Sequence, residues 1–568
     1  MATPPSDIDR IWLAKYPKDV PTHVDIPSVL LPDLIRASVE KWPDHTALIY
    51  YGAKWTYRQF WEESEHLAAA FRQNGIGPGD RVALYLPNGP LYPIAFFATL
   101  RLGATVVQVS PLYLGQDLVR ILEDSGAKAV VTLEILFPNL AKVRDEYAVP
   151  VAFVARLREF YPWHLRPFVN LVLRRQKRPT QFPNEAWVRP YAAARRTPGP
   201  LPPFSGDPAT TVAVFQYTGG TTGVPKAAML THRNLVANIE QANAWNTSRR
   251  PGEEVIMASI PFFHVYGLTV ALLMGLADGG TLVIQTNARE IRELLKLIDR
   301  YQPTQFPGVP ALYNAFNSQP DIAKFRVHSI KYCLSGSAPL PLEVARRFEA
   351  LTGGSIIEGY GLSETSPVTH ANPLHGERRA GSVGLPIPDT DERVVDLETG
   401  TRVLGTGEVG ELEIRGPQVM LGYYGKPDET AAVLRDGWFR TGDIARIDAD
   451  GYCYIVDRKK DMINVGGMKV YPRDVEEVLF QHPAVQDAAV IGVPDPEHGE
   501  VVKAYVVKKP GATVTAEELI AFVRERLAHY KAPRSIEFRS ELPKSGVQKV
   551  LRRVLRDEDA AAATRPAR

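Results

Sequence analysis

The stretch Tyr217–His232, "YTGGTTGVPKAAMLTH", decides how the rest of the chain is interpreted. It holds three Gly, four Thr and one Lys within 16 residues. Glycines let a backbone fold tightly and bring its N–H groups close to an anion, while Thr hydroxyls and a Lys ammonium add further donors. The stretch therefore predicts a loop that binds phosphate.

This loop departs from the Walker A pattern, because Val224 and Pro225 stand where that pattern needs Gly and Ala227 follows Lys226. A buried strand is expected before the loop, over 211–218, and a helix beyond it, over 232–245. The N-terminus of such a helix also favours negative charge. Gly- and Thr-rich turns after strands are common connectors as well, so the loop alone leaves both interpretations open.

Length and composition limit the class of protein. The chain has 568 residues, too many for one ordinary core, so at least two domains are expected. Hydrophobic residues make up 45% and charged residues 23%, which is typical of globular proteins. The net charge of +2, from 66 basic and 64 acidic side chains, indicates no nucleic-acid partner.

The two cysteines, Cys333 and Cys453, are far apart and belong to no CxxC or His cluster. They predict neither a disulfide framework nor a zinc site, in keeping with a reducing compartment. No secretory signal is visible, and the longest apolar run, from Val265, is interrupted at Asp278 before the ~20 residues that span a bilayer. A cytoplasmic protein without membrane spans is expected.

Up to about residue 450, short β-branched runs alternate with helical stretches such as 291–301, "IRELLKLIDRY". This alternation is typical of α/β layers with largely parallel sheets. The expected strands are 81–87, 104–109, 127–132 and 281–285. Around 386–425 the pattern changes to short strands with Gly turns, and a tail after "VDRKKD" (456–461) has strand and helix signals of its own.

The predicted fold class is therefore α/β, with a large N-terminal domain of layered α/β subdomains and a small β-barrel-like subdomain, followed by a small mobile α+β C-terminal domain. The expected boundaries are 1–456 for the N-terminal domain, 457–461 for a hinge and 462–568 for the C-terminal domain.

Four further segments accompany the Gly/Thr loop: "SGSAPLP" (335–341), "EGYGLSET" (358–365), 436–461 and "LPKSGVQKVLRR" (542–553). Together, and in this order, the five motifs resemble the adenylate-forming superfamily of acyl-CoA synthetases, luciferases and peptide-synthetase adenylation domains, over about residues 27–559. Within it the closest resemblance is to bacterial long-chain-fatty-acid–CoA ligases, which share 436–460 and "GPQVMLGYY" (416–424).

The resemblance implies a reaction in two halves. A carboxylate attacks the α-phosphate of MgATP to give acyl-AMP and pyrophosphate, and the thiol of coenzyme A then takes the acyl group as a thioester. The implied catalytic residues are Lys549, Glu364, Thr218 and His264. Glu364 and Thr218 are the expected Mg²⁺ ligands, which suits a hard cation held by few protein oxygens.

The resemblance also implies the nucleotide and coenzyme A contacts. Tyr360 would stack on one face of adenine, and the other face of adenine would contact Gly336, Ser337 and Ala338. Asp443 and Arg458 would hold the ribose hydroxyls. The remaining expected contacts are Thr218, Gly219, Gly220, Thr221, Thr222, Gly223, Lys226, Glu358, Gly359, Gly361, Ser363, Lys460, Gly466 and Gly467.

Lys549 corresponds to the family's catalytic lysine, which bridges the carboxylate and the α-phosphate from the C-terminal domain. The usual residue before it is Gly, and here it is Gln548, which puts the geometry of its loop in question. Lys460 stands at the hinge position. Rotation there would carry Lys549 away and bring Gly466 and Gly467 to the coenzyme A tunnel, where glycines let the backbone approach the pantetheine.

Analogy places the acyl pocket between 234–241, 262–275 and 308–316. Gly267, Gly275 and Gly308 are expected to leave room for a chain, and a tunnel of this composition would favour long chains at ~0.8 kcal/mol for each buried CH₂. His264 would orient the carboxylate at the wall towards the nucleotide. A satisfied core histidine is the alternative.

Residues 156–178 carry six Arg and one Lys against one Glu, with Phe160, Tyr161, Trp163 and Phe168 between them. This pattern suits docking onto an anionic membrane surface, or it is a solvated surface excursion. The other expected partners are a fatty acid and, by family analogy, a second copy of the chain in a homodimer.

Two alternatives keep the adenylation half and change the acid or the acceptor: an aryl-acid or 4-coumarate-type CoA ligase, and a fatty acyl-AMP ligase. The second is disfavoured because no insertion precedes the hinge that would block rotation. A third alternative is a non-catalytic nucleotide- or acyl-binding regulator. The retention of Lys549, Glu364, Asp443 and Arg458 argues against it.

Overall fold

The computed structural model describes residues 9–218, 225–544 and 550–563. Contacts divide the chain into two units: a large unit, Trp12–Asp391 with Arg415–Phe439, and a small unit, Met1–Ile11, Glu392–Ile414 and Arg440–Arg568. The fold class is a mixed α/β architecture, as predicted. The contacts group 392–414 and 440–456 with the C-terminal residues, and the boundary at 457–461 stays a prediction.

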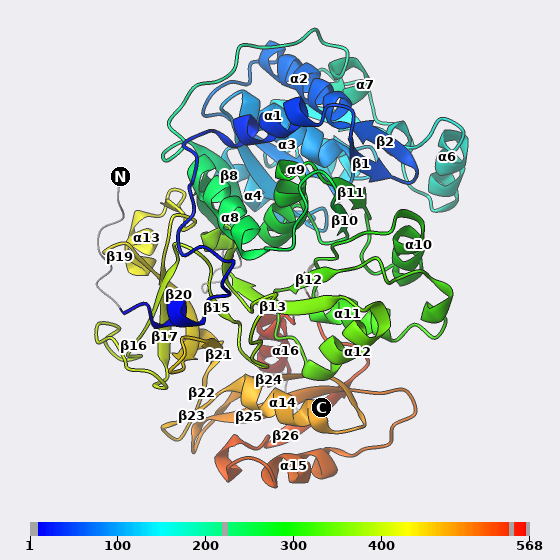
Figure 1. The fold of residues 1–568 in the computed structure, drawn as a ribbon. Coiled ribbons are helices and arrows are strands. Elements are labelled where there is room, and N and C mark those ends of the chain that lie inside the picture. The colour runs from blue at the N-terminus through cyan, green and yellow to red at the C-terminus, as the bar shows by residue number, and fades with distance from the viewer. Residues whose placement is uncertain (1–8, 219–224, 545–549, 564–568) are drawn as a thin grey trace. The chain divides into compact units, whose positions relative to one another are not determined.

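The large unit is built on an eight-stranded sheet of order β18-β9-β8-β4-β3-β5-β6-β7 (Figure 1). The strands from β4 to β7 and the β4–β8 pair are parallel, whereas β9 is antiparallel to both β8 and β18. Their bounds are β3 Arg81–Tyr85, β4 Thr105–Val109, β5 Ala129–Leu133, β6 Val151–Ala155, β7 Val188–Pro190, β8 Val212–Thr218, β9 Lys226–Thr231 and β18 Gly422–Tyr423.

Two four-stranded sheets complete the large unit, in the orders β10-β11-β1-β2 and β12-β13-β14-β15. The first consists of β1 Thr46–Tyr50, β2 Ala53–Thr56, β10 Val255–Ala258 and β11 Thr281–Ile284. The second consists of β12 Tyr332–Ser335, β13 Ser355–Gly361, β14 Val368–Ala371 and β15 Leu385–Pro386. β12 and β13 are parallel, and β14 returns antiparallel to β13.

Helices connect and cover these sheets, and α1, α2 and α3 pack against one another (Figure 1). The bounds are α1 Leu31–Lys41, α2 Tyr57–Gln73, α3 Leu91–Arg101, α4 Gln116–Ser125, α5 Phe137–Lys142, α6 Arg166–Arg175, α7 Tyr191–Ala194, α8 His232–Trp245, α9 Met274–Ala277, α10 Ile291–Tyr301, α11 Pro310–Asn317, α12 Leu342–Thr352 and α13 Pro427–Val433. A π-helical segment, η3 Gly267–Leu273, leads into α9. None of the described helices combines the length and apolar character that a membrane span needs.

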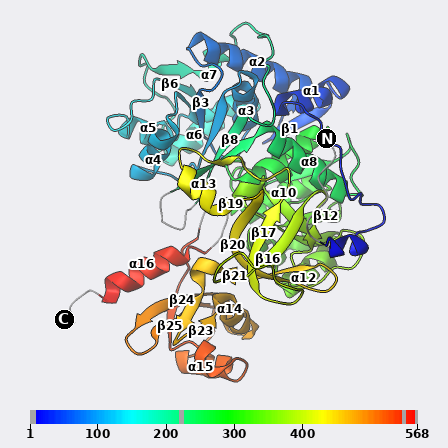
Figure 2. The same cartoon turned by 90° about the vertical axis from the view of Figure 1, so that its left-hand side faces the viewer.

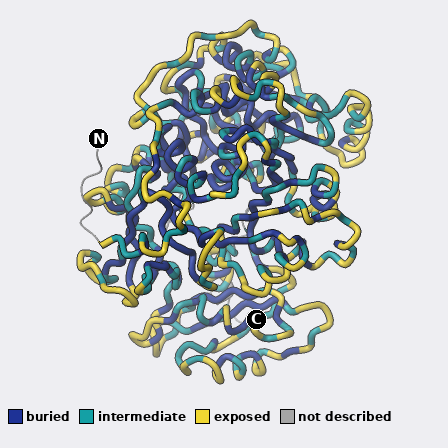
Figure 3. Tube along the Cα trace, viewed as in Figure 1, coloured by how far each residue is buried: buried dark blue, intermediate teal, exposed yellow. Residues whose placement is uncertain are grey.

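Local sequence explains why these elements form where they do. Thr231 caps α8 by accepting from the backbone N–H of Asn234, whose side chain accepts from the N–H of Thr231 in return. β4, β5 and β6 are buried along their whole length, as continuous β-branched runs in a sheet covered on both faces require. Figure 3 shows these strands in the buried interior of the unit.

In the small unit, β16, β17, β20 and β21 lie side by side (Figure 2), and β21 pairs with β20. The C-terminal sheet has the order β23-β22-β25-β24, with β26 beside β25. The bounds are β16 Asp391–Val395, β17 Gly410–Arg415, β20 Trp438–Ile447, β21 Cys453–Arg458, β22 Ile463–Val465, β23 Met468–Val470, β24 Val485–Asp495, β25 Gly499–Lys508, β26 Ser535–Arg539, α14 Pro472–Gln481, α15 Ala516–Arg524 and α16 Arg552–Ala563. The short strand β19, Leu434–Arg435, belongs to the large unit. Leu479 of α14 and Leu519 of α15 pack against this sheet in a core of their own.

Candidate active site

The Gly/Thr loop connects two paired strands of one hairpin. Thr218, the last residue of β8, is the register partner of Lys226, the first residue of β9. The predicted helix 232–245 is confirmed as α8, and a strand that was not predicted, β9, lies between the loop and this helix. Residues 227–231 pair with β8 and thereby satisfy their backbone donors and acceptors in the sheet. The N-terminus of α8 is therefore separated from Lys226 by the length of β9, whereas the ion-pair partner of Lys226, Glu429, lies in the first turn of α13.

Lys226 is held by two side chains of the large unit. Its ammonium forms an ion pair with Glu429 of α13, and it lies 5.4 Å from the centre of the Tyr423 ring. The predicted phosphate contacts Gly219, Gly220, Thr221, Thr222 and Gly223 lie outside the described residues. Thr218 and Lys226 therefore mark the two ends of the predicted phosphate loop.

Glu364 lies in a single 3₁₀ turn, η5 Ser363–Thr365, which packs against β8 and β9. Its carboxylate accepts a hydrogen bond of 2.9 Å from the hydroxyl of Tyr423. Its backbone carbonyl accepts from the N–H of Met420 at 2.8 Å. Tyr423 therefore contacts both Glu364 and Lys226, and its burial next to Glu364 raises the pKa of its hydroxyl well above the usual value.

The motifs at 335–341 and 358–365 meet because β12 and β13 are parallel and Ser335 is the register partner of Glu358. Gly336, Ser337 and Ala338 therefore leave the sheet at the edge where Gly359, Tyr360 and Gly361 lie. The carboxylate of Glu358 accepts from the N–H of Leu340 at 3.2 Å and joins the two segments. The structure thus brings together the residues predicted to enclose adenine.

The shape of this edge depends on close backbone packing. A Cβ at Gly361 would lie 1.9 Å from the carbonyl oxygen of Pro367, which leaves no space for a side chain. A Cβ at Gly336 would lie 3.2 Å from the ring of Tyr266, whose hydroxyl donates to the carbonyl of Leu334 at 2.6 Å. The ring of Tyr360 is half-buried.

His264 stands just before the helical segment that contains Tyr266. Its Nδ1 accepts from the backbone N–H of Tyr266 at 3.3 Å, and its carbonyl accepts from Leu268 at 2.9 Å. The imidazole is half-buried, so it is neither a fully packed core histidine nor a surface one.

Two predicted ribose contacts pair in the small unit. Asp443 of β20 is the register partner of Arg458 of β21, and the Arg458 Nε lies 3.4 Å from Asp443 Oδ1. Asp443 is buried, with 4% of its surface exposed, and Arg458 is half-buried. A carboxylate fixed beside a guanidinium suits the recognition of neighbouring hydroxyl groups.

The predicted hinge, 457–461, is held by the helices on its C-terminal side. Asp457 accepts from the N–H of Arg473 at 2.8 Å, and Asp461 forms ion pairs with Arg552 at 3.3 Å and Arg556 at 2.6 Å. Burial raises the pKa of Asp457 to about 6. Lys460 lies at the exposed surface of this segment.

Gly466 and Gly467 form the two-residue turn between β22 and β23, where Val465 pairs with Met468. Their φ angles of +58° and +88° lie in the left-handed region that glycine adopts without strain. Both residues are exposed, and their N–H groups donate to the carbonyl of His498 at 2.8 Å and to the side chain of Asn464 at 2.9 Å. Lys549 and its neighbour Gln548 lie outside the described residues.

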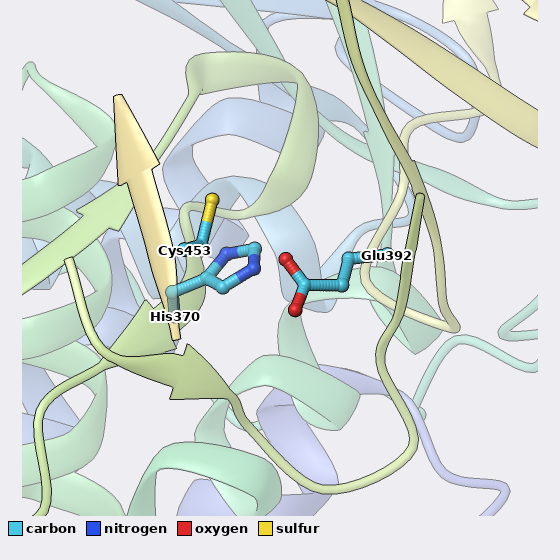
Figure 4. A group of neighbouring side chains, drawn as sticks. All are labelled: His370, Glu392 and Cys453. Atoms are coloured by element: carbon cyan, nitrogen blue, oxygen red, sulfur yellow. The ribbon is translucent and has the colours of Figure 1, made fainter. Parts of the chain in front are cut away.

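Neither cysteine has the character of a nucleophile. Figure 4 shows Cys453 of β21 and Glu392 of β16, both in the small unit, where burial and the carboxylate raise the pKa of the thiol well above its usual value. Burial likewise raises the pKa of Cys333 in the large unit. Thiols of this kind stay protonated and inert. His370, also drawn in Figure 4, belongs to the large unit, where its Nδ1 lies 2.9 Å from Thr369 Oγ1.

An apolar cavity of the large unit lies beyond the edge of β12 and β13. The segment 262–275, predicted as a wall, contributes Val270 and Met274. The other two predicted walls, 234–241 and 308–316, contribute none of the residues around the cavity. Residues just beside them do so instead, and the full lining is Ala242, Trp245, Asn246, Val270, Met274, Gln305, Pro307, Tyr332, Cys333, Leu334, Ile357, Val368, Ala371, Leu374 and Ile387.

The expectation that three glycines leave room for a chain is wrong. A Cβ at Gly267 would lie 2.1 Å from the carbonyl oxygen of Pro261. A Cβ at Gly275 would lie 2.6 Å from Leu282, and one at Gly308 would lie 2.8 Å from Tyr313. At each of these positions the space is filled by the protein itself, so the glycines serve close packing.

Two functional candidates, Tyr423 and Glu429, were not predicted. Tyr423 is part of "GPQVMLGYY", a segment that resembles the family but whose residues had no assigned role. Glu429 follows on α13 and has no sequence signal, since a lone surface Glu is ordinary. Their position beside Lys226 and Glu364 is what identifies them.

The residues present fit a bound Mg²⁺. The half-buried Glu364 supplies a carboxylate in a turn packed against β8 and β9, and Thr218 supplies a hydroxyl at the end of β8. Oxygen donors of these types are the ligands that Mg²⁺ prefers, with phosphate oxygens completing the set.

Comparisons with known proteins agree with this geometry. The AMP-binding enzyme family matches residues 35–424, and the AMP-binding enzyme C-terminal domain matches 474–549. A long-chain-fatty-acid–CoA ligase of Bacillus subtilis is 43% identical over 96% of this chain and 98% of its own length, and one of Escherichia coli O157:H7 is 41% identical over 97% and 98%.

Among solved structures, the anthranilate CoA ligase AuaEII in complex with anthranoyl-AMP superposes with a TM-score of 0.84 at 26% identity, over 95% of this chain and 99% of its own. The family match covers most of the chain, the relatives match it over nearly its full length, and the turn that contains Glu364 packs against β8 and β9, the strands on either side of the predicted phosphate loop. The chain belongs to the AMP-binding, adenylate-forming enzymes.

Proposed function

We propose that this protein is an ATP-dependent long-chain-fatty-acid–CoA ligase, which converts a fatty acid, ATP and coenzyme A into acyl-CoA, AMP and pyrophosphate. The Bacillus subtilis and Escherichia coli relatives, which are named for this activity, match the chain over nearly their full length. The observation that carries the proposal is the apolar cavity that begins at the edge where the predicted nucleotide residues meet.

In the first half-reaction, the residues around Tyr423 receive the triphosphate. Lys226 exchanges Glu429 for a phosphate oxygen, and Thr218 and the Gly/Thr loop offer hydroxyl and N–H donors. Glu364, fixed by Tyr423, would hold Mg²⁺ together with Thr218, and the ion would supply positive charge to neutralise the phosphates. Adenine lies against Tyr360 and Gly336, and Asp443 and Arg458 hold the ribose.

Positioning and charge neutralisation supply most of the rate enhancement, because both reactants are anions. His264 orients the fatty acid carboxylate towards the α-phosphate, and Lys549 bridges the two groups. Rotation at the hinge around Lys460 then removes Lys549 and presents Gly466 and Gly467 to the pantetheine of coenzyme A.

The proposal is tested by measuring AMP release from purified protein with MgATP, coenzyme A and acids from C6 to C18, with 4-coumarate for comparison. AMP formed only when a fatty acid and coenzyme A are both present supports the ligase. Pyrophosphate release without thioester would favour the acyl-AMP ligase, and turnover of 4-coumarate alone would favour the aryl-acid ligase.

A second part of the proposal is that the enzyme docks on an anionic membrane surface through α6 and the residues before it. Trp163 and Phe168 are 80% and 64% exposed, and Leu171 and Val172 on α6 are 47% and 50% exposed. Leu173 anchors the helix from its buried face. Figure 3 shows this excursion largely exposed.

The charge of this surface complements an anionic bilayer. Arg166, Arg174, Arg175, Lys177 and Arg178 are all exposed on α6 or directly after it. Each basic residue near such a surface contributes about 1 kcal/mol, and the aromatic rings prefer the depth of the headgroups. Such a surface would give a cytoplasmic enzyme direct access to fatty acids in the membrane.

Membrane docking is tested by co-sedimentation of the full chain with phosphatidylcholine vesicles that contain or lack phosphatidylglycerol. Binding is expected only with the anionic lipid, and W163S/F168S should abolish it. F480S is the matched control, since Phe480 is 48% exposed on α14. Equal loss in both variants, or no binding at all, would leave the solvated excursion as the correct interpretation.

The homodimer also remains a prediction, which light scattering tests.

A further inference from the structure

Four segments around the apolar cavity show which of its ends lies near the predicted nucleotide residues and which lies far from them. We call the edge of β12 and β13 where Ser335 and Glu358 pair the nucleotide edge. On β12, Leu334 lies next to this edge, and Tyr332 lies at the opposite end of the strand. At ~3.3 Å per residue, the three steps along the strand from Ser335 to Tyr332 span about 10 Å. Gln305 pairs with Tyr332 and Gly308 with Ser335, so the neighbouring segment runs the same way.

On the other side of the cavity, β14 and α8 also run from the nucleotide edge towards the far end. Val368 of β14 pairs with Gly361 at the nucleotide edge, and its backbone is bound by the side chain of Asn238 in the middle of α8. At the other end of β14, the indole N–H of Trp245, the last residue of α8, donates to the carbonyl of Asn372. Asn246 directly follows. Gln305, Tyr332 and Asn246 therefore lie together at the far end of an otherwise apolar cavity.

At the far end, a hydrogen bond joins the side chains of two lining residues. Gln305 Nε2 donates to the hydroxyl of Tyr332 at 2.8 Å, and the ring of Tyr332 is buried. The Tyr332 hydroxyl also faces Glu254, and burial together with this carboxylate raises its pKa well above the usual value.

Glu254 has its own partners behind Tyr332. It is 2% exposed, and it accepts from the N–H of Arg250 at 2.9 Å and from the hydroxyl of Thr304. Polar groups in a buried network are costly to separate, because each group left without a partner loses its hydrogen bond and is not rehydrated. Apolar atoms therefore cannot pass this point without loss.

We propose that the Gln305–Tyr332 pair is the stop that limits the length of the acyl chain. The inference rests on the proposed function, because it requires that the cavity holds the fatty acid. Each methylene that fits between the nucleotide edge and the pair is buried among apolar side chains. A methylene beyond that point must displace a hydrogen-bonded pair, which costs more than its own burial returns.

The stop is tested by the dependence of kcat/KM on chain length from C6 to C18, in the wild type and in Q305A and Y332F. For the wild type, kcat/KM should rise about fourfold for each added CH₂, equivalent to ~0.8 kcal/mol, and then fall beyond one length. Both variants should move this maximum to longer acids. The shift should be larger in Q305A, which removes bulk as well as polarity.

The shortest acids are the internal control, because they end before the pair and should be used equally by all variants. Q319A and Y147F are the matched controls outside the cavity, since each removes a side chain that donates to a backbone carbonyl, that of Ala315 or of Ala127. Both should retain the wild-type profile. A profile that is unchanged in Q305A and Y332F, with normal turnover, would overturn the stop and leave the ligase intact. Absence of turnover by the wild type on every fatty acid would overturn the proposed function itself.

Discussion

The nucleotide edge and the far end of the acyl cavity are built in different ways. At the nucleotide edge, strand register decides which residues meet: Thr218 opposite Lys226, and Ser335 opposite Glu358. At the far end, Asn246, Gln305 and Tyr332 come from three separate segments and meet through side-chain packing. In our proposal, the first arrangement fixes the chemistry and the second fixes which acid is accepted.

This difference predicts different kinds of mutational effect. A change at the nucleotide edge acts on the triphosphate, which every acid uses, so it should lower turnover by the same factor for all acids. A change at the far end should matter only for acids long enough to reach it. The following experiments test this distinction, beginning with the largest expected effect.

E364Q should lower kcat roughly 10²- to 10³-fold, equivalent to about 3–4 kcal/mol of lost electrostatic stabilisation. The variant keeps the shape and the hydrogen bond to Tyr423 but removes the charge that would hold Mg²⁺. The measurement is AMP release with C8 and C16 acids at saturating MgATP. E343Q, on the exposed start of α12, is the matched control. A loss confined to one chain length would contradict the assignment of Glu364 to the nucleotide.

Y423F should lower kcat/KM for ATP by roughly ten- to a hundredfold, because it removes a hydrogen bond to a charged carboxylate worth about 1.5–3 kcal/mol. The expected loss is smaller than for E364Q, since the carboxylate itself remains. Y424F is the control, because the ring of Tyr424 packs against Phe215 in the same stretch. Equal effects in the two variants would mean that the segment, and not the hydroxyl of Tyr423, is what matters.

E429Q should lower the KM for ATP by roughly fivefold, in line with the ~1 kcal/mol upper range of a partly exposed ion pair, and leave kcat unchanged. Glu429 competes with phosphate for Lys226, so its neutralisation frees the ammonium. D428N, an exposed neighbour on α13, is the matched control. A higher KM in E429Q would show that Glu429 orients Lys226 and does not compete for it.

The sequence predicted which residues meet at the β12–β13 edge, because its motifs are contiguous and the family resemblance assigns a role to each of them. It also predicted α8 and α10 with their exact bounds, 232–245 and 291–301, since both have a regular apolar face. The strand β9 between the phosphate loop and α8 was not predicted. "KAAMLT" has no period that separates a short buried strand from a helix, and only pairing with β8 decides it.

The far end of the cavity could not be predicted in this way. Gln305 follows an ordinary loop and Tyr332 begins a short strand, and neither belongs to a motif. The three glycines that suggested space are filled by neighbouring atoms, because the sequence shows a missing side chain but not what replaces it. Residues that meet only through tertiary packing become visible only in the structure.

Chemical labelling of Cys333 has the smallest expected effect, and it tests whether the far end of the cavity is closed. The thiol lines the cavity but is 2% exposed, and burial raises its pKa. Because a raised thiol pKa keeps the reactive thiolate scarce until the pH exceeds it, labelling by N-ethylmaleimide should stay near zero throughout pH 7–9. Cys453, buried in the small unit, should behave identically, and unfolding in urea should expose both thiols.

In C453A, Cys333 is the single thiol, so any label must be attached to the residue that lines the cavity. Labelling of this variant in the native state, suppressed by a long-chain acid, would show that the cavity opens to solvent beyond Tyr332 and would contradict a closed far end. Labelling that a long-chain acid does not suppress would point to local opening of β12. No labelling under either condition, together with a chain-length maximum that moves in Q305A, is the result expected if a hydrogen-bonded pair closes the cavity.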